Sequence, residues 1–169
     1  VGIASYLAEH PRADARTLGD LISYNLEHPQ ELAHFGQEIF VQSEATAGLE
    51  DPKYLAAVQR CRRAGRDEGI DSALAAAEVD ALAVPSYLPA WKSDLVNGDP
   101  HGLYSSAQLP AVAGYPAVTV PVGLVGGLPV GLTIFGTARS EQVLLRLGGA
   151  VEAAAGPLPP PTFRAPEPG

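Results

Sequence analysis

The stretch AVAGYPAVTVPVGLVGGLPVGLTIFG, residues 111–136, constrains the fold most, because it places two apolar runs on either side of a glycine-rich turn. Short runs rich in β-branched residues and bounded by glycine and proline are typical of strands. Glycine supplies the positive φ angles that a tight hairpin requires. Phosphate-binding glycine loops instead connect a strand to a helix. We therefore predict strands over 117–122 and 130–135 that are joined as a hairpin.

The N-terminal part of the sequence predicts helices in three or four pieces. Thr17 and Asp20 have the spacing of a capping box, and Pro29 should end or kink the helix that they begin. A helical apolar stripe continues through ELAHFGQEIFVQSEA. Asp51 and Pro52 then fit the N-cap and the first position of another helix.

The pattern changes at Val79, where VDALAVP predicts a short buried strand. Residues 86–104 follow without periodicity, and a connection of this length is more often functional than idle. A short helix is expected to end at Gly114, and an apolar stripe predicts a helix from Ser140 to Gly156. Helices, strands and a last helix indicate an α/β or α+β arrangement, in which three short strands should form the margin of a larger mixed sheet.

The composition restricts the partners of the chain. It has 169 residues, 46% of them hydrophobic, and a net charge of -8. This charge argues against nucleic acid and against an anionic membrane as partners. The short basic run RCRRAGR predicts the solvated face of a helix. The chain has a single cysteine, Cys61, so it cannot form a disulfide within itself. Cys61 is expected to be buried as a small apolar residue.

The start of the chain suggests that the sequence is part of a longer protein. It contains no methionine, and VGIASYLAEHP shows helical spacing with no capping residue in front. We therefore expect the C-terminal part of something longer. Any targeting signal would then lie in the missing part, so the location stays unknown, with the cytoplasm favoured. No apolar run of this sequence approaches the length of a membrane span.

The residues alone reveal no complete catalytic site. The sequence lacks the GxSxG serine motif and the HExxH zinc motif. His101, beside Asp99 in the long connection, is the one histidine considered for a site, although a surface role is favoured for it. Asp94 and Asp99 could form a carboxylate pair, but loop aspartates are usually turn formers. Neither a metal nor another cofactor is predicted.

Five motifs in one order carry a family resemblance. DALAVPS, PAW followed by DLVNGD, AVAGYPAVTVPVG, GLPVGLTIFG and SEQVLL together resemble the C-terminal part of the amidase signature family, and in particular its peptide-amidase-like members. The resemblance runs from about Thr17 to Val151 and is strongest over 80–145. It includes the helical stretches ADARTLGDLISYNLEH and YLAAVQRCRR.

The resemblance implies an activity whose catalytic residues lie elsewhere. Members of the family cleave carboxylic amides with a serine nucleophile, a second serine in a cis peptide and a lysine, all on an upstream segment rich in glycine and serine. Lys53 and Lys92 stand in no matching motif, and Ser105 and Ser106 lack the surrounding glycines. We therefore expect no catalytic residue in this chain, and the resemblance implies no cofactor.

The resemblance also implies an α/β fold with a mixed sheet covered by helices. Residues 1–169 would be the C-terminal part of a single amidase domain. They would comprise a helical segment (1–78), the sheet margin with a cleft loop and the last helix (79–156), and a proline-rich tail (157–169). The loop would line the substrate cleft through four side chains, for which ordinary loop packing remains an equal alternative: Trp91, Asp94, Asn97 and Tyr104.

Two classes of function follow. One is an amidase whose catalytic part is absent from this sequence, with a small-molecule or peptide amide as substrate and the upstream part as partner. The other is a separate, noncatalytic binding or subunit-like protein derived from the same fold. Uncovered sheet edges favour association, so a homo-oligomer is also an option.

Overall fold

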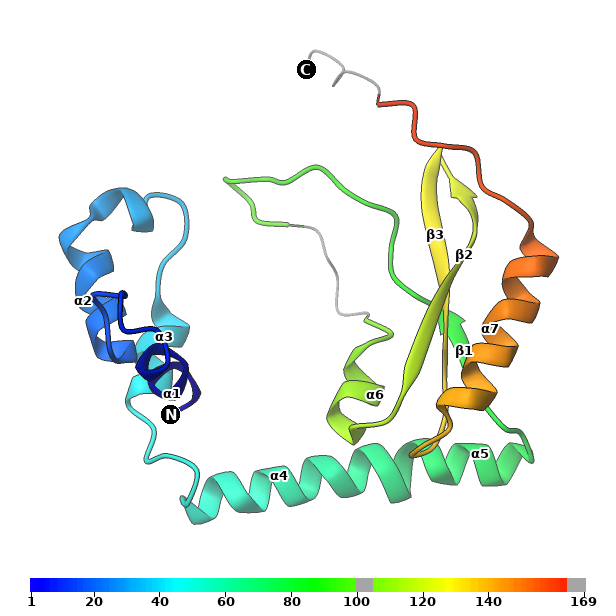
Figure 1. Ribbon diagram of the computed structural model, residues 1–169, viewed down its shortest axis with the longest axis horizontal. Coiled ribbons are helices and arrows are strands. Elements are labelled where there is room, and N and C mark those ends of the chain that lie inside the picture. The colour runs from blue at the N-terminus through cyan, green and yellow to red at the C-terminus, as the bar shows by residue number, and fades with distance from the viewer. Residues whose placement is uncertain (100–104, 164–169) are drawn as a thin grey trace. The chain divides into compact units, whose positions relative to one another are not determined.

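The computed structural model describes residues 1–99 and 105–163 (Figure 1). The chain divides into two compact units, Val1–Gln59 with Ser93–Gly98 and Arg60–Lys92 with Asp99–Gly169. The predicted order of helices, strands and a last helix is confirmed. The elements of the described residues are α1 (Gly2–Ala8), α2 (Leu18–Glu27), a 3-10 turn (Pro29–Leu32), α3 (Glu38–Glu44), α4 (Pro52–Gly65), a π-helical turn (Arg66–Ile70), α5 (Asp71–Ala77), β1 (Leu82–Pro85), α6 (Gln108–Ala113), β2 (Ala117–Val125), β3 (Leu128–Phe135) and α7 (Glu141–Ala155).

The start of α2 in the first unit confirms the predicted capping box. The Asp20 amide donates to Thr17 Oγ1 at 3.1 Å, and Asp20 Oδ2 accepts from the Thr17 amide at 2.9 Å. A second amide, that of Arg16, donates to the same carboxylate oxygen at 2.7 Å and, with the Thr17 bonds, lowers the pKa of Asp20. Because the two orphan amides are satisfied locally, sequence spacing alone was enough to predict this helix start.

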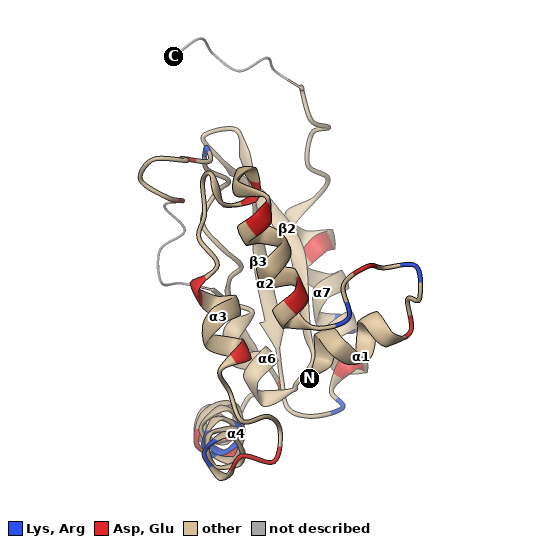
Figure 2. Cartoon of the chain, turned by 90° about the vertical axis from the view of Figure 1, so that its left-hand side faces the viewer, with Lys and Arg blue, Asp and Glu red and all other residues tan. Residues whose placement is uncertain are grey.

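The continuous helical stripe expected after α2 is wrong. The chain forms a 3-10 turn at Pro29–Leu32, leaves the helical path, and becomes helical again only at α3. Gly36 lies in the break and disfavours helix there. The side chain of Gln37 holds the break against α2, since its Oε1 accepts from Asn25 Nδ2 at 3.1 Å and its Nε2 donates to the Ile22 carbonyl at 3.3 Å. The charged residues of α2 and α3 are all acidic (Figure 2).

A three-stranded antiparallel sheet in the order β1-β3-β2 forms the centre of the second unit. The predicted hairpin is confirmed: Gly126 and Gly127 connect β2 to β3 with φ angles of 60° and 82°. Two consecutive positive φ angles are the requirement of a type I′ turn. Both strands continue closer to the turn than predicted, with a register shift between Pro121 and Gly123.

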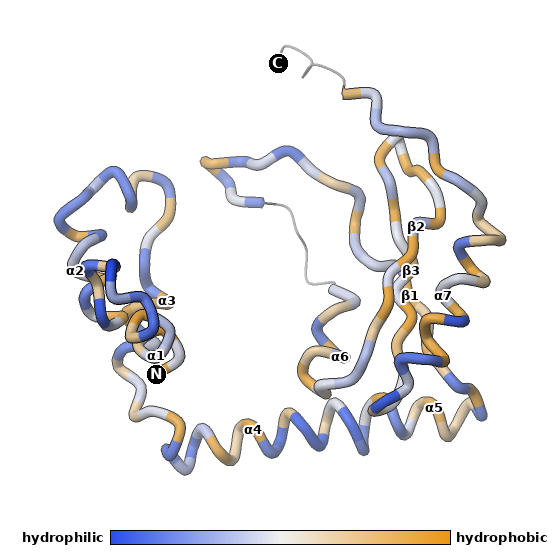
Figure 3. Tube along the Cα trace, in the orientation of Figure 1, coloured by the Kyte–Doolittle hydropathy of each residue, from blue (hydrophilic) through white to orange (hydrophobic). Residues whose placement is uncertain are grey.

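The two faces of this sheet are covered by different helices. On one face, α7 packs against β2 (Figure 1). Gly148 lies at this contact, where a Cβ atom would be in ordinary van der Waals contact, 3.4 Å from a Val118 methyl and 3.5 Å from a Val120 methyl. On the other face, a buried cluster forms from side chains of the π-helical turn, α5, α6 and β3; its members are Ile70, Leu74, Ala113 and Phe135. Figure 3 shows the apolar character of β3 and of the facing side of α7.

Two expectations about the basic run RCRRAGR need correction. Cys61 is exposed rather than buried, because α4 buries only Gly65 among its residues. Arg66 is not merely a solvated side chain. Its Nε donates to the Ala113 carbonyl at 2.6 Å, and its guanidinium lies 5.5 Å from the centre of the Tyr115 ring. Arg66 therefore attaches the end of α4 to α6 in the second unit.

Much of the apolar surface that a folded chain normally buries is exposed. In the described part of the first unit, Leu7 is the only buried hydrophobic side chain. In the sheet, β1 and β2 each pair only with β3 among the described residues, which leaves two strand edges open. The expectation that VDALAVP forms a buried strand is wrong for one face of β1, because Ala83 and Pro85 are exposed. Open edges and uncovered apolar helices both favour association.

We expect the isolated chain to self-associate at micromolar concentration and to unfold without a sharp transition. Light scattering and thermal unfolding check this expectation. The control is a polypeptide extended to the length of the relatives described below, which should be monomeric or of defined size and should melt cooperatively. A sharply melting monomer of residues 1–169 would contradict it.

Candidate functional site

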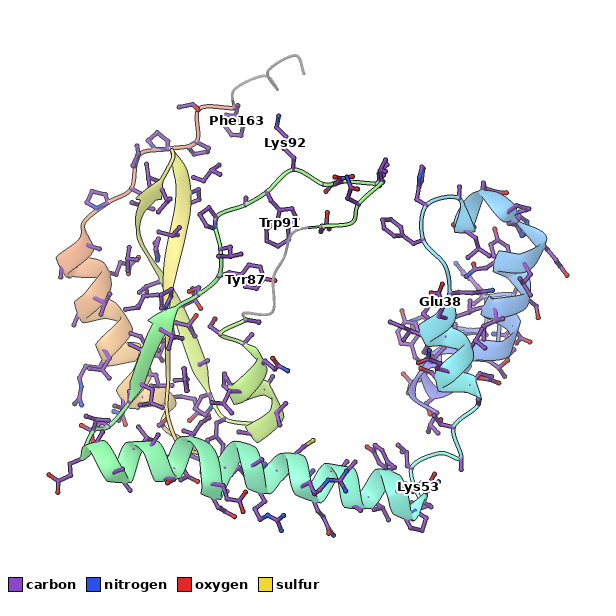
Figure 4. The ribbon with its side chains drawn as sticks, turned by 180° about the vertical axis from the view of Figure 1, so that it is seen from behind. Glu38, Lys53, Tyr87, Trp91, Lys92 and Phe163 are labelled. Atoms are coloured by element: carbon purple, nitrogen blue, oxygen red, sulfur yellow. The ribbon has the colours of Figure 1, made fainter. Side chains whose placement is uncertain are left out.

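The connection after β1 was predicted to line a substrate cleft, and its first part lies in the second unit. Trp91 is half-buried there, and its ring centre lies 5.6 Å from that of Tyr87 with an interplanar angle of 40°. Both side chains project from the segment that leaves β1 (Figure 4). The separation and tilt are typical of a stabilising aromatic pair. Trp91 is thus fixed to its own segment by packing rather than fully exposed.

Asp94 and Asn97 lie together in the first unit, in a turn that the aspartate organises. Asp94 Oδ1 accepts from the amides of Val96 and Asn97 at 2.8 and 2.9 Å, and its Oδ2 accepts from Asn97 Nδ2 at 2.9 Å. These bonds, the Asn97 amide first, lower the pKa of Asp94. Gly98 follows with a φ angle of 80° and donates to the Asp94 carbonyl at 3.0 Å. The carboxylate is therefore a turn former, as its loop position indicated.

The remaining candidates of the connection are distributed differently. Tyr104 and His101 lie outside the described residues, so their predicted roles stay predictions. Asp99 is exposed, in the second unit. The structure thus brings Asp94 together with Asn97, and it brings Trp91 together with Tyr87.

A hydroxyl cluster that sequence reasoning missed lies on the sheet at the base of this connection. We use this name for four side chains: Ser86, Ser106, Thr119 and Thr133. Thr133 Oγ1 donates to Ser86 Oγ at 2.8 Å and lies 2.9 Å from both Ser106 Oγ and Thr119 Oγ1. Thr133 is only 3% exposed and is the one buried polar residue among the described residues. The available sequence signal was a threonine in each of the two predicted hairpin strands, Thr119 and Thr133. Only the pairing register shows that these two threonines lie opposite each other.

A second polar contact joins α5 to the start of β2. The Tyr115 hydroxyl donates to Asp71 Oδ2 at 2.6 Å, and this bond to the carboxylate, together with desolvation, raises the pKa of the tyrosine. A shallow pocket of about 380 Å³ lies beside it, lined by Asp71, Leu74, Ala75, Glu78, Val79, Asp80 and Thr137. Across the described residues, no three metal-binding side chains are placed to hold a metal ion.

Hydrolytic chemistry would need a serine activated by a base, and the described residues contain no such pair. Ser106 Oγ, one of the two serines considered from sequence, is bonded to Thr133. The side chains of Lys53 and Lys92 make no hydrogen bond to a hydroxyl anywhere in the described part of the chain. Within that same part, no helix has the length and apolar content needed to cross a membrane.

Comparison with known proteins gives the arrangement a family context. Residues 3–145 match the family model described as Amidase. A protein of Schizosaccharomyces pombe assigned as an amidase is 33% identical over 89% of this chain and 26% of its own length. One component of the glutamyl-tRNA(Gln) amidotransferase of Marinobacter nauticus is 36% identical over 86% of this chain and 34% of its own length.

The similarity to solved structures is greater still. The structure of native peptide amidase from Stenotrophomonas maltophilia is 44% identical, with a TM-score of 0.85, over 97% of this chain and 33% of that chain. The expected amidase-type fold, with helices and a small sheet, is confirmed by this match. The chain spans only about a quarter to a third of the length of these relatives.

Proposed function

Because the chain belongs to the amidase family, we propose that it forms part of a hydrolase that cleaves carboxylic amide C–N bonds. The observation that carries the proposal is the 44% identity to a peptide amidase over 97% of this chain. Function resides in a site and not in a fold alone, so the proposal concerns the whole protein to which this chain contributes.

The nucleophile of the proposed enzyme is a serine assisted by a second serine and a lysine, on a segment that this sequence does not contain. Serine Oγ would attack the amide carbonyl carbon, the C–N bond would break, and the amine would leave with a proton. Water would then hydrolyse the acyl-serine ester and release the acid. This assignment rests on the family resemblance of the sequence, because no motif of residues 1–169 matches the serine and lysine segment of the family.

The part contributed by this chain is the sheet margin and a wall of the substrate cleft. The sequence prediction that Trp91, Asp94, Asn97 and Tyr104 line this wall is kept as part of the proposal. Trp91 lies in the second unit and has apolar aromatic area, and the turn of Asp94 and Asn97 lies in the first unit and has polar side chains. A peptide amide has both side chains and backbone polar groups, so each of these kinds of side chain suits it. The substrate class of the peptide amidase supports the same choice.

Substitution of Trp91 or Asp94 in an extended, active polypeptide should change substrate selection more than stability. Each alanine variant should alter kcat/KM unevenly across a panel of peptide and aryl amides, by about 10-fold for the most affected substrate. The melting temperature should stay nearly constant, because loop side chains contribute little to the core.

Matched variants serve as controls for both positions. Trp91→Phe keeps an aromatic ring against Tyr87, and Val96→Ala removes a 90% exposed side chain while the amide that bonds Asp94 remains. Val96→Ala should retain the substrate ranking of the parent, and Trp91→Phe, which keeps a smaller aromatic ring, should alter the ranking less than Trp91→Ala does. A uniform loss of activity with a large drop in melting temperature would show that the connection is structural and would remove these residues from the site.

A further inference from the structure

We propose that Thr133 is a positioning residue that holds together the two ends of the connection between Ser86 and Ser106, and so sets the placement of Trp91. The effect on substrate selection rests on the function proposed above. The attachment of the two ends, which we call the fastening, does not rest on the proposed function. It follows from contacts within the second unit alone.

The two ends of the connection meet on the sheet. Ser86 is the residue directly after β1, and Ser106 lies two residues before α6. The Ser106 amide donates to the Ser86 carbonyl at 3.4 Å, and the Ser86 amide donates to the Gly131 carbonyl of β3 at 2.8 Å. The hydroxyl of Thr133 contacts both serine hydroxyls, at 2.8 and 2.9 Å. The side chain of Thr133, on the central strand β3, is therefore hydrogen-bonded to both the first and the last residue of the connection.

Thr133 uses its whole hydrogen-bonding capacity in this arrangement. A hydroxyl has one donor and two acceptor positions. Thr133 donates to Ser86 and has Ser106 and Thr119 on its two acceptor positions. A buried hydroxyl whose partners are all present rigidifies its surroundings, whereas its removal leaves those partners unsatisfied. Because all its hydrogen-bonding positions are occupied, the Thr133 hydroxyl is unsuited to bind a ligand directly. Thr133 therefore affects the site by positioning the connection.

The side chain of Ser86 occupies the space that a Cβ atom on Gly131 would need. A Cβ atom on Gly131 would lie 2.8 Å from Ser86 Oγ and 2.9 Å from Thr119 Cγ2. Glycine at this position of β3 therefore permits the first end of the connection to approach the sheet. Attaching Ser86 to the sheet removes conformational freedom from the residues of the second unit that directly follow it, 87–92, because one end of that segment is held. Trp91 lies five residues after the fastened Ser86 and shares in that loss of freedom.

The test uses the extended polypeptide in which any tryptophan outside residues 1–169 is replaced by phenylalanine, so that Trp91, the single tryptophan of residues 1–169, is the reporter. Thr133→Val keeps the shape of the side chain and removes the hydroxyl. We expect it to raise acrylamide quenching of the Trp91 emission by about twofold, because local opening becomes more frequent. Hydrogen exchange in the peptide that contains the Ser106 amide should accelerate by about fivefold, which corresponds to the loss of one net hydrogen bond.

Two further variants separate fastening from general destabilisation. Thr119→Val removes a hydroxyl that bonds the same Thr133 oxygen but belongs to β2, and it leaves both ends attached. It should therefore change neither readout. Thr133→Ser restores the hydroxyl and should return both readouts to those of the parent. Equal quenching and exchange in the Thr133→Val and Thr119→Val variants, or no recovery in Thr133→Ser, would overturn the proposal.

The effect on catalysis is measured as the ranking of amide substrates by the extended polypeptide. There Thr133→Val should change the ranking of amide substrates, whereas Thr119→Val should preserve it. If quenching responds as expected but the extended protein hydrolyses no amide, the proposed function fails and the fastening stands. If the protein is active and the ranking is the same in all three variants, the positioning role in substrate selection is refuted.

Discussion

Residues 1–169, assayed alone, are expected to hydrolyse aryl, aliphatic and peptide amides no faster than buffer does. Amide hydrolysis at neutral pH needs an activated nucleophile, and the described residues pair no hydroxyl with a lysine. An extended polypeptide that carries the serine and lysine segment should be faster by at least roughly a million-fold, the lower range of enzymatic acceleration. Release of ammonia or amine from the amide panel measures both proteins.

The serine pair provides the stringent control for this result. Turnover by the chain alone that disappears in Ser105→Ala or Ser106→Ala would place a nucleophile within this sequence and refute the proposed location. Turnover that survives both substitutions would indicate a contaminating enzyme. The contact of Ser106 with Thr133 already engages the hydroxyl that such a nucleophile would need.

Replacement of Leu144 by alanine should be the most destabilising change in the second unit. Leu144 is 1% exposed on α7, and its side chain fills the space between that helix and the end of β3 near Gly136. The loss of buried methyl groups and the cavity left behind should cost about 2–4 kcal/mol. Hydrogen exchange of α7 and of the β2–β3 hairpin should accelerate by roughly 30- to 1000-fold as a result.

The adjacent residue provides a matched control for this substitution. Leu145 is 66% exposed, so Leu145→Ala removes the same atoms from the same helix at the same propensity cost. Its effect should stay within about 0.5 kcal/mol, as is usual for surface positions. Similar exchange in the two variants would mean that α7 does not pack on the sheet as described.

Local features of the fold were predictable from the sequence because their causes lie within a few residues. Thr17 and Asp20 satisfy each other's amides within one helical turn. Gly126 and Gly127 adopt positive φ angles that other residues rarely adopt, so the hairpin follows from two adjacent glycines. The five ordered motifs likewise predicted the family, which the match over residues 3–145 confirms.

The errors have a different origin, since each involved a neighbour that is remote in sequence, although the local Gly36 also contributes to the break after α2. The apolar stripe around Phe35 fits a helix, yet Gln37 bonds the carbonyl of Ile22 and the helix is interrupted. Cys61 has the character of a buried residue, but burial depends on what covers α4. Arg66 was grouped with exposed arginines, and only the position of Ala113 reveals its bond.

The sequence by itself determined where helices and turns begin, which strands form the hairpin, and to which family the chain belongs. The tertiary structure alone decided that β3 lies between β1 and β2, and that a threonine of β3 meets serines from both ends of a long connection. The physical reason is the range of the interactions. Caps and tight turns are set by neighbours within about four residues. The hydroxyl cluster joins residues 14 to 47 positions apart, and the pairing of β1 with β3 joins residues 47 to 53 positions apart. No local preference specifies those partners.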